Sequence, residues 1–481
     1  MRRVTRLLAL SIVFACAGPP RPAPTDSARI ALGPVAGDVR VGSAVLWARA
    51  SGPGTLAFEL DPPDALIAPV RVHAARDFTA RVRIAGLRPA THYEVRVRGG
   101  AGEPATGRFE TPAEPTAASP VRLAWGGDLA GQNVCRDAQA GFAIFGALVR
   151  LAPQVFVGLG DMIYADDVCE SRGRYGNAQR PGDFFAAADL PAWWAHWRYA
   201  REDPGQAELL ARTSYVAVWD DHEVVNDSGP LNPKSPELMP LGLRAFLDYN
   251  PVSSDSRETP ERLYRALRLG KHVELFVLDT RQYRDANRAP DAPPAAPKSM
   301  LGREQLTWLR ESLAGSNATW KVIVSSVPLG VATGFPAANG RDGWSGVDQD
   351  TGFGRERDEI LRFMAERGIA TSIWLTTDVH YAEVFAHRPF ADRPEFRVIE
   401  AISGPMNAGV QTPQPIDPSL RSEIRFLHAP SAESPIETWE QALRYFNFGA
   451  LEVAESGELT LRIIGVTGES LYEERFAPPS H

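Results

Sequence analysis

The sequence has little cysteine, no excess of positive charge and no serine-hydrolase motif. Only three cysteines occur in 481 residues, and 51 lysines and arginines stand against 59 aspartates and glutamates, which gives a formal net charge of −8. A chain without excess positive charge does not favour nucleic acid as a partner. No Gly-x-Ser-x-Gly elbow follows any predicted strand, and this argues against a serine hydrolase.

Size and composition indicate an ordinary globular protein with more than one domain. The chain exceeds the length at which one hydrophobic core usually stops growing, so two domains are expected. Hydrophobic residues make up 44% and charged residues 23%, close to the average of globular proteins. An acidic protein that acts on an anion has to create a positive field locally, and bound metal ions are the most compact means of doing so.

The N-terminus is typical of an export signal. Three arginines precede an apolar run at residues 7–15 that is too short to span a bilayer. Cys16 follows in a pattern that resembles a bacterial lipoprotein box, in which the cysteine becomes the lipidated first residue. The alternative is a plain secretory signal, and the general and twin-arginine routes both stay open. Residues 1–16 are therefore expected to be a signal peptide with its lipobox and residues 17–28 a tether, so that the protein is periplasmic or a lipoprotein of the outer membrane or cell surface.

The other two cysteines, Cys135 and Cys169, form an even pair in a chain expected to enter an oxidising compartment. A disulfide between them is the leading interpretation, with a thiol metal ligand or two inert thiols as alternatives. Each cysteine lies a few residues downstream of a candidate metal-binding aspartate. A bridge would therefore brace two loops of one site against each other.

Residues 29–112 are expected to form a small all-β sandwich. Short segments such as residues 43–49 alternate polar and apolar side chains, with glycine and proline turns between them. The stretch from Leu87 to Tyr93 looks like the corner of fibronectin type III domains, where a leucine and a tyrosine anchor the turn into a late strand. The proline-, alanine- and threonine-rich residues 113–120 are then a linker.

Residues 121–481 are expected to form a layered α/β domain, because apolar β-rich runs alternate there with amphipathic helices. Two helices are clearly delimited, at residues 302–314 and 355–367. Each carries apolar residues on one face and stops before a glycine, Gly315 or Gly368.

Four apolar strands in this domain end in a polar cluster that directly follows the last hydrophobic residue. Since ligand sites of α/β sheets form at the carboxyl ends of strands, the four clusters are expected to converge in space. The clusters are Gly126-Gly-Asp128, Gly160-Asp161-Met-Ile-Tyr164, Asp220-Asp221-His222-Glu223 with Asn226, and Thr377-Asp378-Val-His380.

The residue types in these clusters predict a binuclear or multinuclear metal centre. Oxygen donors with one or two imidazoles suit iron, manganese, zinc, calcium or magnesium rather than a thiolate site. Two such metals activate a hydroxide and clamp the attacking and leaving oxygens of an in-line displacement at phosphorus, so hydrolysis of phosphate esters is expected. The expected ligands are Asp161 as the bridge, Asp128, Tyr164 and His380 for one metal, and Asp221, Asn226 and Asp378 for the other.

His222 adjoins a predicted ligand and is expected to be catalytic, either protonating the leaving alkoxide or holding the phosphate. Each candidate also has an ordinary structural interpretation. An aspartate after a strand is commonly a helix N-cap or a turn residue, and a single histidine such as His380 is more often hydrogen-bonded in the fold than bound to a metal. Four such clusters in order at strand ends are much harder to explain by capping.

In these motifs the sequence resembles the alkaline phosphatase D (PhoD-like) family, over nearly the whole mature chain. The resemblance rests on the four clusters, on the N-terminal sandwich and on residues 278–284, 300–308 and 320–321. It implies a four-layer α/β/β/α metallophosphoesterase sandwich preceded by a fibronectin III-like domain. It also implies hydrolysis of phosphate mono- or diesters, with iron and calcium as the metals. Purple acid phosphatases look similar at the Gly-Asp-x-x-Tyr element.

Three positions depart from the family pattern. Asp128 stands where the family often has a cysteine ligand, Thr377 replaces the usual glycine before the Asp-Val-His element, and Asp227 replaces the second residue of a common asparagine pair. An aspartate in place of a thiolate makes the first site harder, and zinc or manganese are then alternatives to iron.

Further residues are assigned by position. Of the adjacent Asp220 and Asp221, the latter is favoured as a ligand because it adjoins His222. Arg198 is the candidate that binds the phosphate of the substrate, with pairing to carboxylates in the fold as the alternative. For Arg281, which lies in a strand-end motif, pairing with carboxylates is the expected role.

The expected substrates are small or polymeric phosphate esters, and the expected state is a monomer. Sequence-specific binding of nucleic acid is not expected, and contact with a membrane is expected only through a lipid on Cys16. The rival interpretation is a non-catalytic surface lipoprotein whose sandwich binds a partner and whose larger domain has decayed. The intact set of candidate ligands argues against it.

Overall fold

The computed structural model describes residues 27–100, 102–253, 261–334, 337–347, 350–369 and 371–479. The predicted signal, Cys16 and all but the last two residues of the predicted tether lie outside these residues. Within the described residues, the search for a helix with the length and apolarity to cross a membrane finds none.

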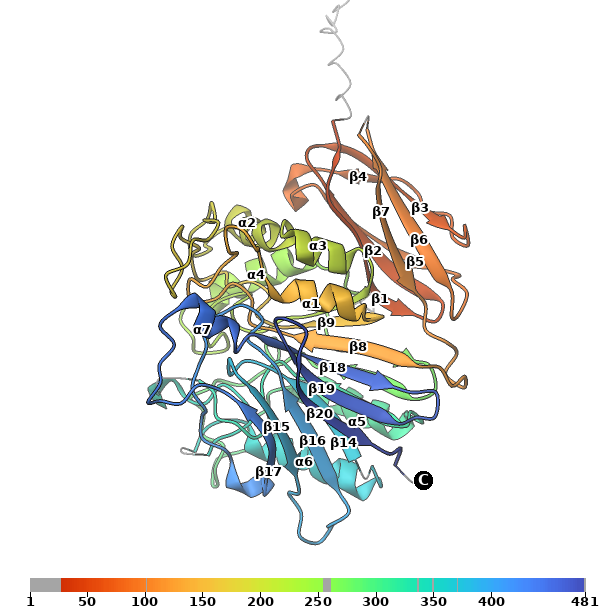
Figure 1. The fold of residues 1–481 in the computed structure, drawn as a ribbon. Coiled ribbons are helices and arrows are strands. Elements are labelled where there is room, and N and C mark those ends of the chain that lie inside the picture. Colours follow the sequence, from red (N-terminus) through yellow and green to blue (C-terminus); the bar gives the residue numbers. More distant parts are fainter. Residues whose placement is uncertain are drawn as a thin grey trace, which may run out of the picture.

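Two large sheets form the middle of the molecule (Figure 1). The first contains, in spatial order, β20 (Ser470–Phe476), β19 (Leu459–Gly465), β18 (Asn447–Val453), β8 (Val121–Gly126), β9 (Val155–Leu159), β10 (Ser214–Val218), β1 (Ile30–Arg40), β2 (Ser43–Ala50) and β5 (Thr79–Ala85). The second contains β11 (Arg265–Leu269), β12 (Val273–Val277), β13 (Trp320–Val324), β14 (Thr371–Thr376), β16 (Arg397–Ile402), β15 (Ala382–His387) and β17 (Glu423–His428).

Helices cover the outer face of each sheet (Figure 1). Over the first sheet lie α1 (Ile144–Leu151), α2 (Leu190–Arg201), α3 (Pro204–Leu210), α4 (Ser235–Tyr249) and the short α7 (Trp439–Leu443). Over the second lie α5 (Gly302–Gly315) and α6 (Gly354–Glu366). The layers are thus helix, sheet, sheet and helix, as expected from the family resemblance. Three single turns of 3-10 helix complete the elements, at Ala74–Arg76, Ala337–Asn339 and Pro418–Leu420.

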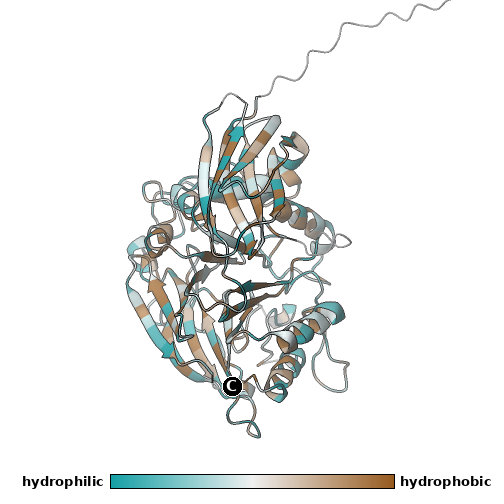
Figure 2. Cartoon of the chain, turned by 90° about the vertical axis from the view of Figure 1, so that its right-hand side faces the viewer, coloured by the Kyte–Doolittle hydropathy of each residue, from teal (hydrophilic) through white to brown (hydrophobic). Residues whose placement is uncertain are grey.

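The central strands are apolar on both faces because both faces are covered. In β9, Val155, Val157 and Leu159 pack into the core between the sheets, whereas Phe156 packs under the helices. This alternation is the period of two of a strand, and its burial on both sides explains why the sequence reads as a continuous apolar run. Figure 2 shows strands in the middle of the molecule in the hydrophobic colour.

Both helices that the sequence delimits are present with nearly the predicted limits. They correspond to α5 and α6, and they bury Leu309, Leu313 and Ile360 against the second sheet. Gly368 follows α6 with φ of 73°, a left-handed conformation that glycine adopts at low cost.

The N-terminal sandwich has its own core but shares a sheet with the rest of the chain. Its second sheet consists of β4 (Val70–Val72), β3 (Gly54–Asp61), β6 (His92–Gly99) and β7 (Ala105–Glu110). At the predicted corner, the hydroxyl of Tyr93 accepts a hydrogen bond from the backbone N–H of Arg88 at 2.8 Å, and Leu87 packs in the same core. The other face of the sandwich is β1-β2-β5, and β1 also pairs in parallel with β10 through Ala36 and Ser214. No local pattern of residues indicates this shared sheet.

Candidate metal centre

The strand ends predicted to carry the site meet at one edge of the two sheets. β8, β9 and β10 run parallel in adjacent positions, so the residues that follow them lie side by side. β14 of the second sheet ends next to them. One carboxylate oxygen from each of Asp161, Asp220, Asp221 and Asp378 lies within 4.8 Å of the others. The structure therefore brings together strand ends from both sheets.

A second group of predicted ligands contains an imidazole. Nε2 of His380 is 3.0 Å from the hydroxyl oxygen of Tyr164 and 3.8 Å from Oδ1 of Asp128. The Nδ1 side of the same ring donates to the carbonyl oxygen of Gly409. This bond puts the proton of a neutral ring on Nδ1 and leaves the lone pair of Nε2 for the hydroxyl of Tyr164 or for a cation. Metal-binding histidines are commonly oriented in this way.

Burial makes the negative charges of these residues costly. It raises the pKa of Asp128 to about 7, and it holds the pKa of Asp161 and of Asp378 well above the ordinary aspartate value. For Asp161 and Asp378, repulsion from neighbouring carboxylates raises the pKa further. A bound cation would remove this cost because it supplies the opposite charge.

At these strand ends, four buried carboxylate oxygens find no hydrogen-bond partner among the described residues. They belong to Asp128, Asp220, Asp221 and Asp378. A buried polar atom without a partner costs about 1–3 kcal/mol, and more when it is charged. Such atoms in a folded protein indicate a function or an ion. Oxygen donors with an imidazole suit hard cations, so this donor set fits the metals that the sequence predicts.

The backbone is strained at four of the predicted ligands. The angle φ is 59° at Asp128, 50° at Asp161, 82° at Asp378 and 60° at His380. Residues other than glycine adopt this left-handed region rarely, at a cost of the order of 1 kcal/mol each. Strain of this kind concentrates at functional sites, where the surrounding fold enforces it.

Glu223 fixes two of the strand ends to each other. Its carboxylate accepts hydrogen bonds from the backbone N–H groups of Asp161 and Met162, at 3.0 and 2.8 Å, and from that of Asp220 at 2.7 Å. Burial raises its pKa to about 8. Glu223 therefore sets the position of the residues after β9 relative to those after β10.

A cavity of about 350 Å³ opens beside these ligands. Asp221, His222, Asp378 and His380 line it, together with Gln132, Asn226, Asp227, Thr333, Asp342 and Gln411. Asn226 is exposed, and its backbone N–H donates to Asp166 at 2.8 Å. It lies at the cavity as predicted, while its role as a ligand stays a prediction.

Comparison with known proteins identifies the family. A family model described as PhoD-like phosphatase matches residues 123–458. This chain belongs to the PhoD-like phosphatase family. Alkaline phosphatase D of Bacillus subtilis (strain 168) is 28% identical over 243 residues, which are 46% of this chain and 40% of that protein. The match thus spans less than half the length of this curated relative.

Solved structures agree on the fold. A structure described as PhoD superposes with a TM-score of 0.71 over 95% of this chain and 90% of its own, at 19% identity. The purple acid phosphatase PPD1 from seeds of yellow lupin (Lupinus luteus) superposes with a TM-score of 0.61 over 94% of this chain and 75% of its own, at 11% identity. These likenesses confirm the predicted metallophosphoesterase-like fold.

Two positions at which this PhoD-like chain departs from the family pattern are in contact. The hydroxyl of Thr377 donates to Oδ2 of Asp128 at 2.7 Å. The bond satisfies one oxygen of this carboxylate and leaves Oδ1 without a partner. Asp128 is thus oriented to offer a single oxygen to a cation.

The structure separates the two adjacent aspartates after β10. Oδ1 of Asp220 accepts from Nε of Arg281 at 2.5 Å and from the hydroxyl of Ser326 at 2.7 Å. Arg281 also binds the carboxylate of Asp342 through two bonds, at 2.9 and 2.7 Å. It therefore pairs within the fold, as expected. Each aspartate keeps one oxygen without a hydrogen-bond partner among the described residues, but of the two it is Asp221 that lines the cavity, which favours it as the ligand.

His222 lies beside the ligands and is oriented by a second carboxylate. Its Nδ1 is 2.7 Å from Oδ1 of Asp166, and the centre of its ring is 4.1 Å from that of Tyr164. Burial lowers the pKa of His222, but the charges of Asp166 and Asp221 outweigh it and raise the pKa to about 10. With Nδ1 engaged by Asp166, Nε2 is the nitrogen left for a substrate.

Two acidic residues of the site had no recognised signal in the sequence. Asp166 follows a predicted ligand closely and reads as part of a loop. Asp342 comes from a long loop after β13 with no apolar strand in front of it, and Arg281, Arg284 and Asn287 all donate to its carboxylate. Burial raises the pKa of Asp342, but the two guanidinium groups lower it far more.

Arg198 does not reach the site. Its NH1 is 2.6 Å from Oδ2 of Asp77, at the contact between α2 and the N-terminal sandwich. Asp77 also accepts from Arg49 and Tyr249. The proposed binding of phosphate by Arg198 is not supported by this position. The sequence does not show that the sandwich supplies a buried carboxylate to pair with it.

Cys135 and Cys169 form the predicted disulfide, with their Cα atoms 5.8 Å apart. The bond joins the loop that follows Asp128 to the loop that follows Tyr164. The side chain of Asn407 also holds the first loop in place, because it donates hydrogen bonds to the carbonyl oxygens of Val134 and Cys135. The disulfide thus braces two loops that carry candidate ligands.

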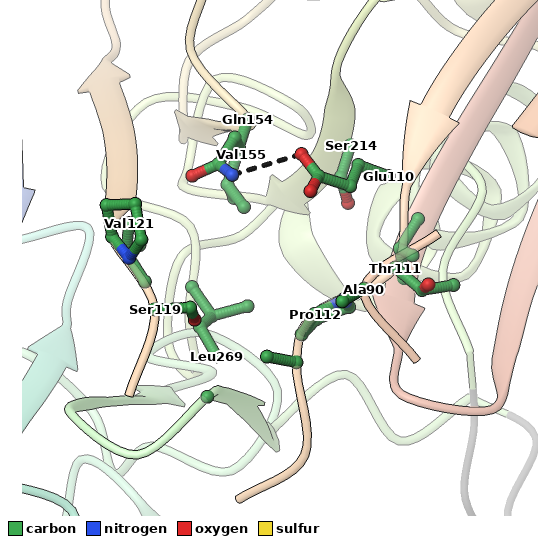
Figure 3. Close-up of a pocket in the computed structure, with 14 residues that line it drawn as sticks. Ala90, Glu110, Thr111, Pro112, Ser119, Val121, Gln154, Val155, Ser214 and Leu269 are labelled. Carbon is green, nitrogen blue, oxygen red and sulfur yellow. Dashed lines mark hydrogen bonds between the residues drawn. The ribbon is translucent and has the colours of Figure 1, made fainter. Parts of the chain in front are cut away.

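A separate cavity lies at the opposite ends of the same strands (Figure 3). It has a volume of about 110 Å³, and Val121, Val155 and Ser214 from the starts of β8, β9 and β10 line it. Its acidic residue, Glu110, accepts a hydrogen bond from Gln154 at 3.1 Å. None of the potential metal-binding groups found in the described part of the chain lies there. The candidate metal-binding groups of the described residues thus lie at the carboxyl ends of the strands.

Proposed function

We propose that this chain is an exported, metal-dependent phosphoesterase that hydrolyses phosphate mono- or diesters. The observation that carries the proposal is the group of buried carboxylates with unpartnered oxygens beside a cavity that His222 also lines. Family membership supports the reaction class. Export is supported by the N-terminal sequence pattern alone, which lies outside the described residues.

The ligands proposed for the metals are those that the sequence predicts. Asp161 would lie between two ions, with Asp128, Tyr164 and His380 on one side and Asp221, Asn226 and Asp378 on the other. The family resemblance favours iron and calcium, and zinc or manganese are alternatives. When bound, the ions would supply positive charge for the phosphate and lower the pKa of a water molecule.

The other residues of the site would orient and donate protons. Asp166 holds His222 through Nδ1, so that Nε2 can donate to the oxygen of the leaving alcohol or to the phosphate. Glu223 keeps Asp161 in place through backbone hydrogen bonds and does not itself line the cavity. Asp166 and Glu223 would therefore act before any substrate binds, by pre-organising the site.

The test is a joint measurement of metal content and hydrolysis on the purified mature protein. The substrates are p-nitrophenyl phosphate and bis(p-nitrophenyl) phosphate, and the variant is Asp161→Asn. The matched control is Asp392→Asn, an exposed aspartate that pairs with Arg362 on the surface. We expect metal and activity in the wild type and in the control, and a loss of activity of about a thousand-fold or more with a loss of metal in Asp161→Asn.

A wild type that hydrolyses both esters without bound metal would contradict the proposal, as would an Asp161→Asn variant with full activity. A metal-loaded wild type that hydrolyses neither ester would favour the rival interpretation of a decayed hydrolase. Visible absorption separates the metals, because a tyrosinate bound to ferric iron is coloured whereas zinc or calcium alone is not. Tyr164→Phe is expected to remove any such colour.

A further inference from the structure

A smaller cavity adjoins the metal centre on the side of Asn226 and Asp227. It has a volume of about 130 Å³. The main cavity of about 350 Å³ contains the same two residues in its lining, so the two spaces are neighbours. A substrate whose phosphate lies at the metal centre could therefore place its alcohol part in the smaller cavity.

One wall of the smaller cavity is a loop that is held in shape by its own hydrogen bonds. The side chain of Asn232 donates to the carbonyl oxygens of Asn226 and Asp227, at 3.0 and 3.4 Å, and accepts from the backbone N–H of Lys234 at 3.0 Å. The backbone N–H of Asp227 donates to Asp221 at 2.6 Å. The loop is thus anchored directly on a candidate metal ligand.

Leu231 at the end of this loop is unusual in two respects. Its side chain is 74% exposed, and its backbone is left-handed with φ of 71°. Glycine or asparagine would adopt this conformation at lower cost, and a polar side chain would be better solvated. Burial in the core cannot explain a leucine here. At this position, in the lining of a cavity that adjoins the metal centre, the leucine side chain can contact an apolar part of a ligand.

Two prolines and one arginine of the lining suit a flat aromatic ring, whereas the rest of the lining is polar: Asn226, Asp227, Asn232, Asn287 and Asn339. Pro230 and Pro233 flank Leu231, and all three are exposed. Arg288 also lines the cavity, and its NH2 donates to Oδ1 of Asn339 at 3.1 Å. A guanidinium that is held in this way can stack on a ring while aliphatic side chains contact the other face. A closed cavity of roughly 150 Å³ holds one benzene ring, and this cavity, at about 130 Å³, is close to that size.

We propose that this smaller cavity is a subsite for an aromatic ring in the alcohol part of the phosphate ester, with Leu231 as its specificity-determining residue. The proposal rests on the proposed phosphoesterase function. Two sources offer such a ring, an aryl alcohol and the base of a nucleotide. In an aryl ester the ring is bonded to the ester oxygen, whereas in a nucleotide the ribose separates the base from the phosphate, so the two sources place a ring at different distances from the metal centre.

The test compares substrates with and without a ring. We expect Leu231→Gly to lower the ratio of kcat/KM for p-nitrophenyl phosphate to that for glycerol 3-phosphate by about ten-fold, because one leucine side chain no longer contacts the ring. Adenosine monophosphate in place of the aryl ester identifies the source. Leu231→Met is expected to restore most of the ratio. Leu66→Gly, in which a fully exposed leucine of the sandwich is removed, is the matched control and leaves the ratio unchanged.

Two further measurements separate this subsite from a structural role and from turnover. Leu231→Gly is expected to melt at the same or a higher temperature than the wild type, because glycine relieves the left-handed backbone. Benzylphosphonate is expected to bind the wild type several-fold more tightly than propylphosphonate, and this difference is lost in Leu231→Gly. Equal binding of both phosphonates, or an unchanged kcat/KM ratio in the variant, would overturn the subsite and leave the phosphoesterase function standing. Failure of the wild type to hydrolyse any ester would contradict that function, while the binding comparison would still decide on the subsite.

Discussion

Two groups of buried carboxylates in this chain have opposite surroundings. At the metal centre, Asp128 and Asp378 are buried with an oxygen that no described residue satisfies. At the contact between α2 and the sandwich, Asp77 accepts from Arg49, Arg198 and Tyr249. The pKa values follow: burial raises that of Asp378 strongly, whereas in Asp77 the hydrogen bonds and charges of its partners outweigh burial and lower it.

A buried carboxylate that stabilises the fold thus differs from a candidate metal ligand in whether its oxygens are satisfied by the protein. A carboxylate whose oxygens are all satisfied holds two elements together and contributes stability. A carboxylate with an unsatisfied oxygen costs stability until an external cation completes it. Removal of the satisfied acid at the contact between α2 and the sandwich should therefore lower stability. Removal of an acid at the metal centre should abolish activity. The following experiments test this distinction between structural and metal-binding carboxylates.

The largest effect is expected at the metal centre. Asp378→Asn should lower hydrolysis of p-nitrophenyl phosphate by about a thousand-fold or more, because a ligand is lost. The metal-free form of this variant should be more stable than the metal-free wild type by about 1 kcal/mol or more, because one of several mutually repelling buried charges is gone. Activity assays and urea unfolding in the presence of a chelator measure both. A metal-free variant that is less stable than the wild type would show that Asp378 serves the fold.

The next effect concerns the disulfide that braces the site. Cys135→Ser together with Cys169→Ser should lower the free energy of unfolding by about 2–4 kcal/mol, because the unfolded chain gains the entropy of an open loop. Urea unfolding of the double variant, with dithiothreitol-treated wild type as the matched reference, measures the loss. A variant as stable as the oxidised wild type would assign the two cysteines no bracing role.

Asp77→Asn should destabilise the protein by about 2 kcal/mol and leave kcat/KM of the folded fraction unchanged, because a partly buried charge pair loses its anion. The pKa of Asp77 is lowered in the folded state, so its contribution is present above the ordinary aspartate pKa of about 3.9 and is lost as the pH falls below it. Thermal unfolding at pH 7 and at pH 3 measures the difference, which should shrink at the lower pH. A difference that grows on acidification would contradict this assignment.

The smallest effect is expected at Arg198. Arg198→Ala should lower the free energy of unfolding by less than about 1 kcal/mol, because the side chain is partly exposed and Arg49 still pairs with Asp77. KM for p-nitrophenyl phosphate should stay the same. A large rise in KM with unchanged stability would restore the original prediction that Arg198 binds the substrate.

Local sequence patterns were sufficient for much of the site. Asp128, Asp161 and Asp378 follow apolar strands directly, and parallel strands bring their ends to one edge, so their convergence could be inferred without coordinates. The limits of α5 and α6 were likewise marked by glycines close to their ends. In each case the signal lies within a few residues of the element that it describes.

The remaining features depend on partners far away in the chain. Asp342 looks like an ordinary loop residue, and only the fold brings it to Arg281. Arg198 has the residue type of a phosphate ligand, and only its distant neighbour Asp77 assigns it to the fold. Thr377 and Asp128 each depart from the family pattern, and only the fold shows that a hydrogen bond joins the two. Residue type alone cannot separate such cases, because their meaning is a long-range contact.

The pairing of β1 with β10 bears on the order in which the protein can assemble during its synthesis. β1 emerges near the start of the chain, but its parallel neighbour β10 is made only after β8 and β9. Until then one edge of β1 has no partner, and open strand edges invite aggregation. The sandwich is therefore not a detachable module. A truncation that removes it would leave the edge of β10 bare in the same way, and we expect an insoluble product rather than a smaller enzyme.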